Sequence, residues 1–160
     1  DNLDLVQDEK RLRSWVVFRL AEIYLNYAEA MNEAYGPDAN NGYALTAKEA
    51  INLVRGRTGV EMPAITTASK EEFREKVKHE RRVELAFEEH RYWDLRRWKE
   101  AATVLNQPLT GVQATKNGNH FSYQVKEVEK RTFVEKMYYY PIPHSEINKS
   151  NGIVKQNPGW

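Results

Sequence analysis

Residues 80–98, ERRVELAFEEHRYWDLRRW, combine charge and aromatic surface at helical spacing. The segment that contains them begins just after Ser69, and its first apolar positions are Phe73 and Val77. At 3.6 residues per turn, the same stripe continues through Glu80, Glu84, Glu88 and Arg91. Burial of a lone charge is very costly, so charged side chains on a core-facing stripe must be paired.

The pattern therefore predicts a buried or half-buried lattice of arginine and carboxylate side chains with a structural role. Its members are Glu80, Arg81, Glu84, Glu88, Arg91, Asp94 and Arg97, with Arg55, Arg57, Arg82 and Arg96 as further candidate partners. Glu84 and Glu88 lie one turn apart, which also allows a glycosidase hypothesis. Arginine neighbours favour ionised carboxylates, however, so neither residue would be a good general acid.

Composition restricts the classes of protein that the chain can belong to. Its 160 residues are 41% hydrophobic, which is enough for one domain that buries roughly two thirds of its unfolded surface. A net charge of +1 gives no reason to expect nucleic-acid binding. The absence of cysteine excludes disulfides and thiol chemistry. No apolar run is long enough to span a membrane, and residues 1–10 do not form a signal peptide.

Two capped helices are expected before the charged segment. After an extended lead-in at 15–18, the apolar positions of the first helix are Leu20, Ile23, Tyr24, Tyr27, Met31 and Ala34. Gly36-Pro37 ends this helix. A capping box of Thr46 with Glu49 begins the second, which is expected to end at Gly59. The short connection predicts an antiparallel hairpin.

A third capping signal, Ser69 with Glu72, opens the charged segment, for which we predict a bend near residues 88–90. The apolar face shifts there, at Tyr92, Trp93, Leu95 and Trp98. Beyond Pro108 the pattern predicts two short strands, at 120–128 and 132–140, which could form a hairpin. The expected fold is a single domain over 1–160, mainly α-helical from 14 to 107, with a loop-rich tail from 108 to 160.

Neither a metal site nor a cofactor site is indicated. His79-Glu80 begins like a zinc-protease motif, but Val83 stands where the second histidine should be. The aromatic residues are candidates for sugar stacking, namely Trp15, Trp93, Trp98, Trp160 and Tyr138 to Tyr140. Trp93 and Trp98 lie beside Leu95 at helical spacing, which favours core packing for both.

Four stretches in order resemble the carboxy-terminal part of SusD/RagB-type proteins. They are FRLAEIYLNYAEAMNEA (18–34), AKEAINLVRGRTGV (47–60), FREKVKHERRVELAFEEHRYWDLRRW (73–98), and YYYPIPHSEIN (138–148) with QNPGW (156–160). The resemblance implies a non-catalytic, mostly helical protein built on tetratricopeptide-like helix pairs. It also implies a surface lipoprotein of the outer membrane that captures glycans and passes them to a SusC-like TonB-dependent transporter.

The same resemblance implies that the chain is the last third of a longer protein, whose lipid anchor and sugar-contacting residues lie upstream. We can therefore assign no ligand residue to any position in this chain. The alternative hypothesis is a tetratricopeptide-like module that binds other proteins and has no carbohydrate role.

Overall fold

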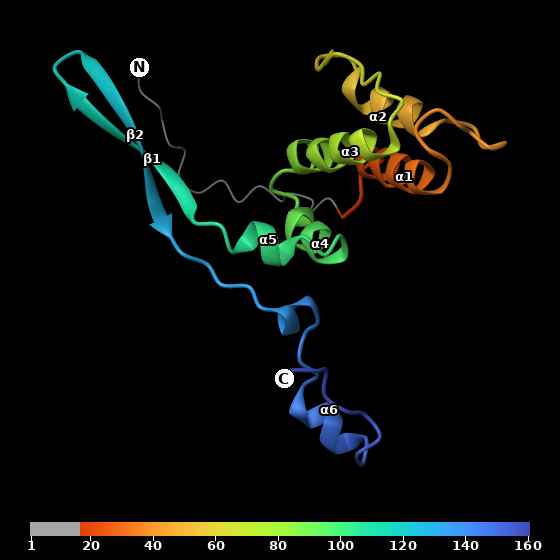
Figure 1. Cartoon of the computed structure of the whole chain (residues 1–160), viewed down its shortest axis with the longest axis vertical. Helices are drawn as coiled ribbons and strands as arrows, with labels where there is room; N and C mark the ends of the chain where they lie inside the picture. Colours follow the sequence, from red (N-terminus) through yellow and green to blue (C-terminus); the bar gives the residue numbers. More distant parts are fainter. Residues whose placement is uncertain (1–16) are drawn as a thin grey trace, which may run out of the picture. The chain divides into compact units, whose positions relative to one another are not determined.

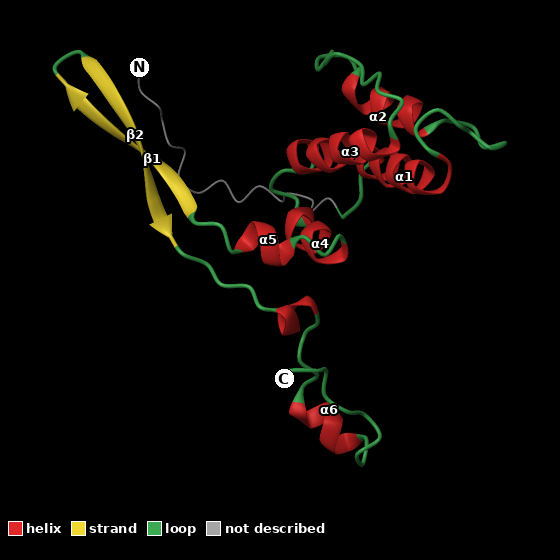
Figure 2. Cartoon of the chain, in the orientation of Figure 1, coloured by secondary structure: helices red, strands yellow, loops and turns green. Residues whose placement is uncertain are grey.

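The computed structural model describes residues 17–160, so Trp15 and the first half of the expected lead-in lie outside the described residues. Two compact units divide this range, one up to Ala86 and the other from Phe87 to Trp160. The fold class expected from the sequence is confirmed, because helices dominate and a short antiparallel hairpin lies near the carboxy terminus (Figures 1 and 2). The single domain over 1–160 stays a prediction.

The first unit is a set of three packed helices, α1 (Leu20–Tyr35), α2 (Ala47–Arg55) and α3 (Lys70–Glu84) (Figure 1). Its core is a single cluster of apolar side chains contributed by all three helices. The largest members without solvent exposure are Leu25, Ile51 and Phe73. Helices α2 and α3 cannot bury an apolar face by themselves at these lengths, so each depends on this shared core.

The sequence signals for the helix ends are mostly confirmed. Thr46 and Glu49 form the complete capping box, in which each side chain bonds the other residue's backbone N–H. At α3 only half of the box forms, because the Glu72 side chain bonds the Thr67 hydroxyl instead of turning back to Ser69. Gly36 follows α1 at a φ of 85°, a conformation that disfavours side chains. Helix α2 ends at Arg55, before the expected Gly59.

The face of α1 that is buried is not the face expected from the sequence. Its buried residues are Glu22, Leu25, Ala28, Met31 and Asn32. Leu20 and Ile23 were expected to face the core, but they are 64% and 51% exposed. Periodicity could not separate the two faces, because Leu20, Ile23, Leu25 and Ala28 are all apolar and spread around the helix.

The predicted bend in the charged segment is confirmed as a complete break. Helix α3 ends at Glu84, residues 85–89 form turns, and α4 (His90–Arg97) begins afterwards. Two residues of this connection, Phe87 and Glu89, have a φ of 64°. A left-handed backbone at non-glycine residues cannot belong to a continuous helix. The apolar stripe of α3 therefore stops at Glu84, and Glu88 and Arg91 do not continue it.

The second unit contains α4, α5 (Ala101–Leu105), a two-stranded antiparallel sheet, a 3₁₀ turn η1 (Glu135–Tyr138) and α6 (His144–Lys149). The strands are β1 (Leu109–Asn117) and β2 (His120–Glu129). The strand expected at 120–128 is correct, but the one at 132–140 is wrong. Residues 109–117 pair with β2 instead, and Gly118 supplies the positive φ of the turn between the strands.

A small apolar cluster holds the second unit together. Leu95, Ala101, Phe133 and Tyr138 are buried in it, and the rings of Phe133 and Tyr138 meet edge to face at 4.9 Å. The tail is closed by side-chain bonds to backbone, including those of the Gln156 amide with Ile142 and of the Trp160 indole with Lys136 O. Trp160 therefore fixes the end of the tail beside η1.

We expect the chain to associate with itself through the start of α1. Val17, Phe18, Leu20 and Ile23 are exposed there, and clustered apolar surface of this kind drives association. The double exchange Leu20→Glu with Ile23→Lys keeps the net charge and should lower the association measured by sedimentation velocity. The control places the same charges on β1, as Gln113→Glu with Thr115→Lys. Equal sedimentation of the two variants at high concentration would contradict this expectation.

Candidate functional site

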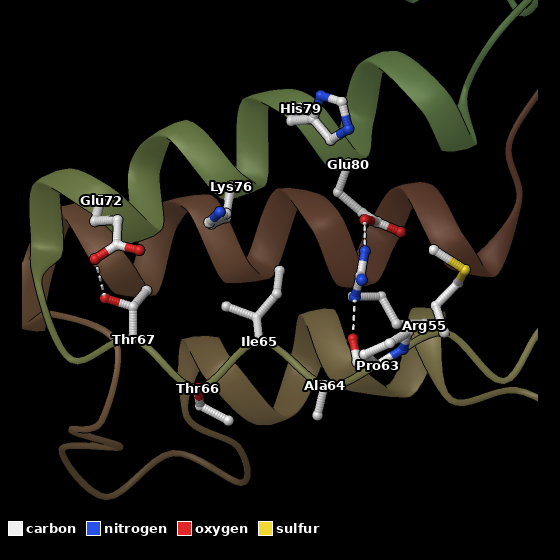
Figure 3. Close-up of a pocket in the computed structure, with 11 residues that line it drawn as sticks. Arg55, Pro63, Ala64, Ile65, Thr66, Thr67, Glu72, Lys76, His79 and Glu80 are labelled. Carbon is white, nitrogen blue, oxygen red and sulfur yellow. Dashed lines mark hydrogen bonds and ion pairs between the residues drawn. The ribbon is translucent and has the colours of Figure 1, made fainter.

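Ion pairs surround the carboxy-terminal half of α3. Glu80 is 7% exposed and pairs with the Arg55 guanidinium of α2. Arg55 also donates from Nε to the Pro63 carbonyl at 2.9 Å, so one guanidinium joins α2, α3 and the loop between them (Figure 3). The pair compensates a charge that would otherwise be buried alone.

Glu84, at the last turn of α3, accepts from two arginines. Arg19 Nη1 lies 2.6 Å from its Oε1, and Arg57 Nη2 lies 2.8 Å from its Oε2. Arg19 also donates to the Glu84 backbone carbonyl, which caps the end of α3. Burial tends to raise the pKa of Glu84, but the hydrogen bonds from Arg57 and Arg19 outweigh it and hold the pKa below 4.5.

The structure brings together only part of the lattice proposed from the sequence. Arg81 is 4% exposed and donates to Asn26 Oδ1 of α1. Asp94 and Arg97 belong to the second unit, where they pair with each other at 2.9 Å. Glu88 and Arg91 follow the end of α3 and are half-buried, each with an interaction of its own. A single lattice running from Glu80 to Arg97 stays a prediction.

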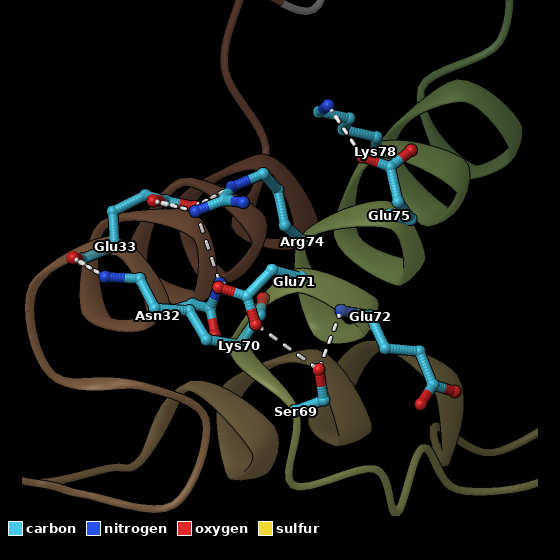
Figure 4. Close-up of polar contacts among 9 residues, drawn as sticks. All are labelled: Asn32, Glu33, Ser69, Lys70, Glu71, Glu72, Arg74, Glu75 and Lys78. Carbon is cyan, nitrogen blue, oxygen red and sulfur yellow. Dashed lines mark hydrogen bonds and ion pairs between the residues drawn. The ribbon is translucent and has the colours of Figure 1, made fainter.

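A second polar cluster joins the other end of α3 to α1 (Figure 4). Arg74 binds the Glu33 carboxylate through two nitrogens at 2.6 and 2.7 Å. That hydrogen-bonded pair lowers the pKa of Glu33. The buried Asn32 amide donates to the Lys70 carbonyl at 3.0 Å. Sequence reasoning missed this cluster because Glu33 and Arg74 are 41 positions apart.

A hollow of about 540 Å³ lies between α3 and the loop at 62–67 (Figure 3). Its carboxylates are already engaged, Glu80 with Arg55 and Glu72 with the Thr67 hydroxyl at 2.7 Å. His79 and Lys76 complete the polar lining. Both carboxylates of this hollow therefore serve local packing, Glu80 against α2 and Glu72 against the loop before α3.

An arginine caged by aromatic rings forms the polar centre of the second unit. The Arg96 guanidinium carbon lies 4.4 Å from the Tyr140 ring centre, 5.1 Å from Trp93 and 5.3 Å from Tyr92. Arg96 Nη2 donates to the Tyr138 carbonyl at 2.5 Å. The core role expected for Trp93 is therefore wrong, because Trp93 is 53% exposed and covers Arg96. Trp98 is half-buried, with Arg97 4.7 Å over its ring.

The Tyr138–Tyr140 segment has one buried and two exposed side chains, so it does not follow the alternation of a strand. Tyr138 is buried and its hydroxyl accepts from the Ala102 backbone N–H, whereas Tyr139 and Tyr140 are both more than half exposed. Lys99 lies 4.1 Å from the Tyr138 ring centre and 4.9 Å from that of Tyr139. Aromatic and cationic side chains of α4 and of the segment 138–140 thus lie together. The sequence did not reveal this because Arg96 and Tyr138 are 42 positions apart.

Within residues 17–160, no group of three or more histidine or carboxylate side chains is arranged to hold a metal ion. Over the same residues, no helix is both long and apolar enough to cross a membrane.

These features define a mainly α-helical scaffold in which the buried carboxylates Glu80 and Asp94 are paired with arginines. The model of the SusD family matches residues 5–160, and the chain belongs to this family. SusD-like protein P25 of Formosa agariphila is 40% identical over 113 residues, which cover 69% of this chain and 20% of that protein. The chain therefore spans about a fifth of the length of this curated relative.

Two crystal structures from Bacteroides fragilis are similar to most of this chain. A SusD-like protein has a TM-score of 0.76 at 38% identity and covers 91% of this chain and 26% of its own. A SusD-like carbohydrate-binding protein has a TM-score of 0.65 at 37% identity, covering 82% of this chain and 27% of its own. The family expected from the four stretches is thereby confirmed.

We predict that Glu80→Ala lowers the free energy of unfolding by about 3 kcal/mol, because it leaves the mostly buried Arg55 charge without its carboxylate. The control is Glu75→Ala on the same helix, whose pair with Lys78 is exposed at the carboxylate and should contribute less than about 1 kcal/mol. Urea unfolding monitored by circular dichroism measures both. Equal losses for the two variants would show that the Glu80 pair is no more than surface charge.

The pH dependence of stability should report on Glu84. Its pKa is lowered in the folded state, so its contribution is complete above the ordinary value of 4.5 and is lost as the pH falls below it. Glu84→Gln should therefore reduce the drop in melting temperature between pH 7 and acidic pH. The drop should not vanish, because Glu33 also has a lowered pKa. An equal fall in melting temperature with pH for the unchanged protein and for Glu84→Gln would contradict this assignment.

Proposed function

We propose that this chain is the carboxy-terminal part of a longer, non-catalytic protein that binds glycans at the outer membrane. The observation that carries the proposal is the family match over residues 5–160, which joins the chain to proteins that include one described as carbohydrate-binding. The surface location, the lipid anchor upstream and delivery to a SusC-like TonB-dependent transporter belong to the same proposal.

The absence of catalysis is also a proposal, and side-chain geometry supports it. Glycosidases need one carboxyl group that stays protonated near neutral pH. Glu84 instead accepts from two arginines and has a lowered pKa, and Glu80 pairs with Arg55. The glycosidase hypothesis paired Glu84 with Glu88, but α3 ends at Glu84, and Glu88 lies in the turns that follow.

A protein-binding module remains the second candidate function, and one observation favours it. The exposed apolar side chains at the start of α1 are of the kind that protein partners cover. The two functions differ in ligand, so glycan binding by the longer protein decides between them.

The main glycan site is expected upstream of this chain. Accordingly, the 160-residue chain should show no measurable affinity for neutral oligosaccharides, because single exposed tyrosines contribute little once binding entropy is lost. The longer protein should bind its glycan with a dissociation constant of roughly micromolar to millimolar. Calorimetric titration of both proteins against one glycan panel measures this. Equal affinity of the two proteins would place the main site in this chain, at Tyr138–Tyr140 and Trp160.

A further inference from the structure

The second unit contains a hollow of about 470 Å³ beside the caged arginine. Its lining residues are Trp93, Arg96, Arg97, Lys99, Tyr138 and Tyr139. Every one is either cationic or aromatic. Tyr138 ends η1 and Tyr139 follows it, whereas Trp93, Arg96 and Arg97 belong to α4 and Lys99 lies just after that helix.

Positive charge is in excess around this hollow. Three of its lining side chains are cations, and none is a carboxylate. Asp94 offsets one of them, since its carboxylate pairs with Arg97 at 2.9 Å. The Lys99 ammonium lies over the faces of Tyr138 and Tyr139, which attract a cation without neutralising it. The hollow therefore keeps a positive potential.

Arg96 adds a buried positive charge beside the hollow that no carboxylate among the described residues is shown to compensate. The residue is 7% exposed, and its Nε and Nη1 atoms are buried with no hydrogen-bond partner among the described residues. Only Nη2 is satisfied, by the Tyr138 carbonyl. The three surrounding rings carry no net charge, so they leave the guanidinium charge without a counter-ion. Buried charge with this little compensation strongly attracts an anion.

The aromatic side chains of the hollow add a surface on which a ring can stack. Trp93 and Tyr139 are 53% and 58% exposed. Exposed indole and phenol faces beside cations suit a ligand that has both an apolar ring face and a negative charge. A sugar ring that carries a carboxylate or a sulfate has these two properties, whereas a neutral sugar has only the first.

We propose that this hollow is an accessory subsite for an acidic sugar residue, meaning one that carries a carboxylate or sulfate group. Lys99 and Arg97 contact the anionic group, Trp93 stacks on the sugar ring, and the Arg96 charge strengthens the attraction from behind the aromatic cage. The proposal rests on glycan binding as the proposed function and adds the class of glycan. It concerns a contact within this chain, separate from the main site expected upstream.

The test compares two ligands of equal length on the 160-residue chain, a trisaccharide of galacturonate and the matched neutral trisaccharide of galactose. Isothermal calorimetry and tryptophan fluorescence should detect binding of the acidic trisaccharide alone, and added salt should weaken it. Lys99→Gln should weaken it about fivefold, as expected for one partly exposed charge pair. Lys116→Gln on β1 removes an equal charge outside the hollow and should change nothing.

Three outcomes would overturn the proposal: binding of neither trisaccharide, equal binding of both, or equal effects of the two lysine variants. Folding is checked by the melting temperature of each variant. Lys99 is exposed, so Lys99→Gln should lower the melting temperature only slightly, through loss of its contacts with the Tyr138 and Tyr139 rings. Failure here leaves the proposed function standing, because that function is tested on the longer protein with the glycan panel. If instead an acidic side chain of the longer protein occupies the hollow, Lys99→Gln should destabilise that protein without affecting its glycan affinity.

Discussion

The ion pairs of arginine with Glu80 and Glu84 are the constraint on which the three-helix unit depends. Helix α3 has a charged residue at two of the positions where a core helix would have an apolar one. Arg55 is the last residue of α2, Arg57 lies in the turn after it, and Arg19 precedes α1. Their pairs with Glu80 and Glu84 therefore attach the end of α2 and the start of α1 to the last turns of α3. Loss of one partner would leave a charge in a poorly hydrated place, which is why such pairs specify packing more strongly than they stabilise it.

The sequence predicted this part of the structure well, because its signals are local or periodic. The capping box at Thr46, the stop at Gly36-Pro37 and the stripe of Phe73, Val77 and Glu80 each depend on residues a few positions apart. Periodicity also located the break after α3, since the apolar face changes there. It could not give the face of α1, because apolar residues occur on more than one side of that helix. Nor could it identify Arg19 as a partner of Glu84, 65 positions away.

The second unit was harder to predict because its structure depends on contacts between residues that are far apart in the sequence. Strand β1 begins LTGVQ, a stretch with little alternation, and it becomes a strand only because β2 pairs with it. Residues 132–140 alternate well, but no strand forms there and residues 135–138 make a 3₁₀ turn. Phe133 and Tyr138 are both buried in the small core with Leu95. Trp93 was expected in that core by its spacing from Leu95. It lies instead over Arg96, whose position depends on a tail 42 residues later.

The two units compensate arginine charge in different ways, and this difference has functional meaning. In the first unit, each buried guanidinium meets a carboxylate or an amide oxygen, so little potential remains to attract a ligand. In the second, Arg96 meets three aromatic faces and one carbonyl, none of which carries a negative charge. A cation–π contact lowers the cost of burying the charge but leaves its field largely intact. Paired arginines therefore serve the packing of α1–α3, whereas the caged one leaves an attraction for anions at a surface that also has exposed rings for a sugar to stack on.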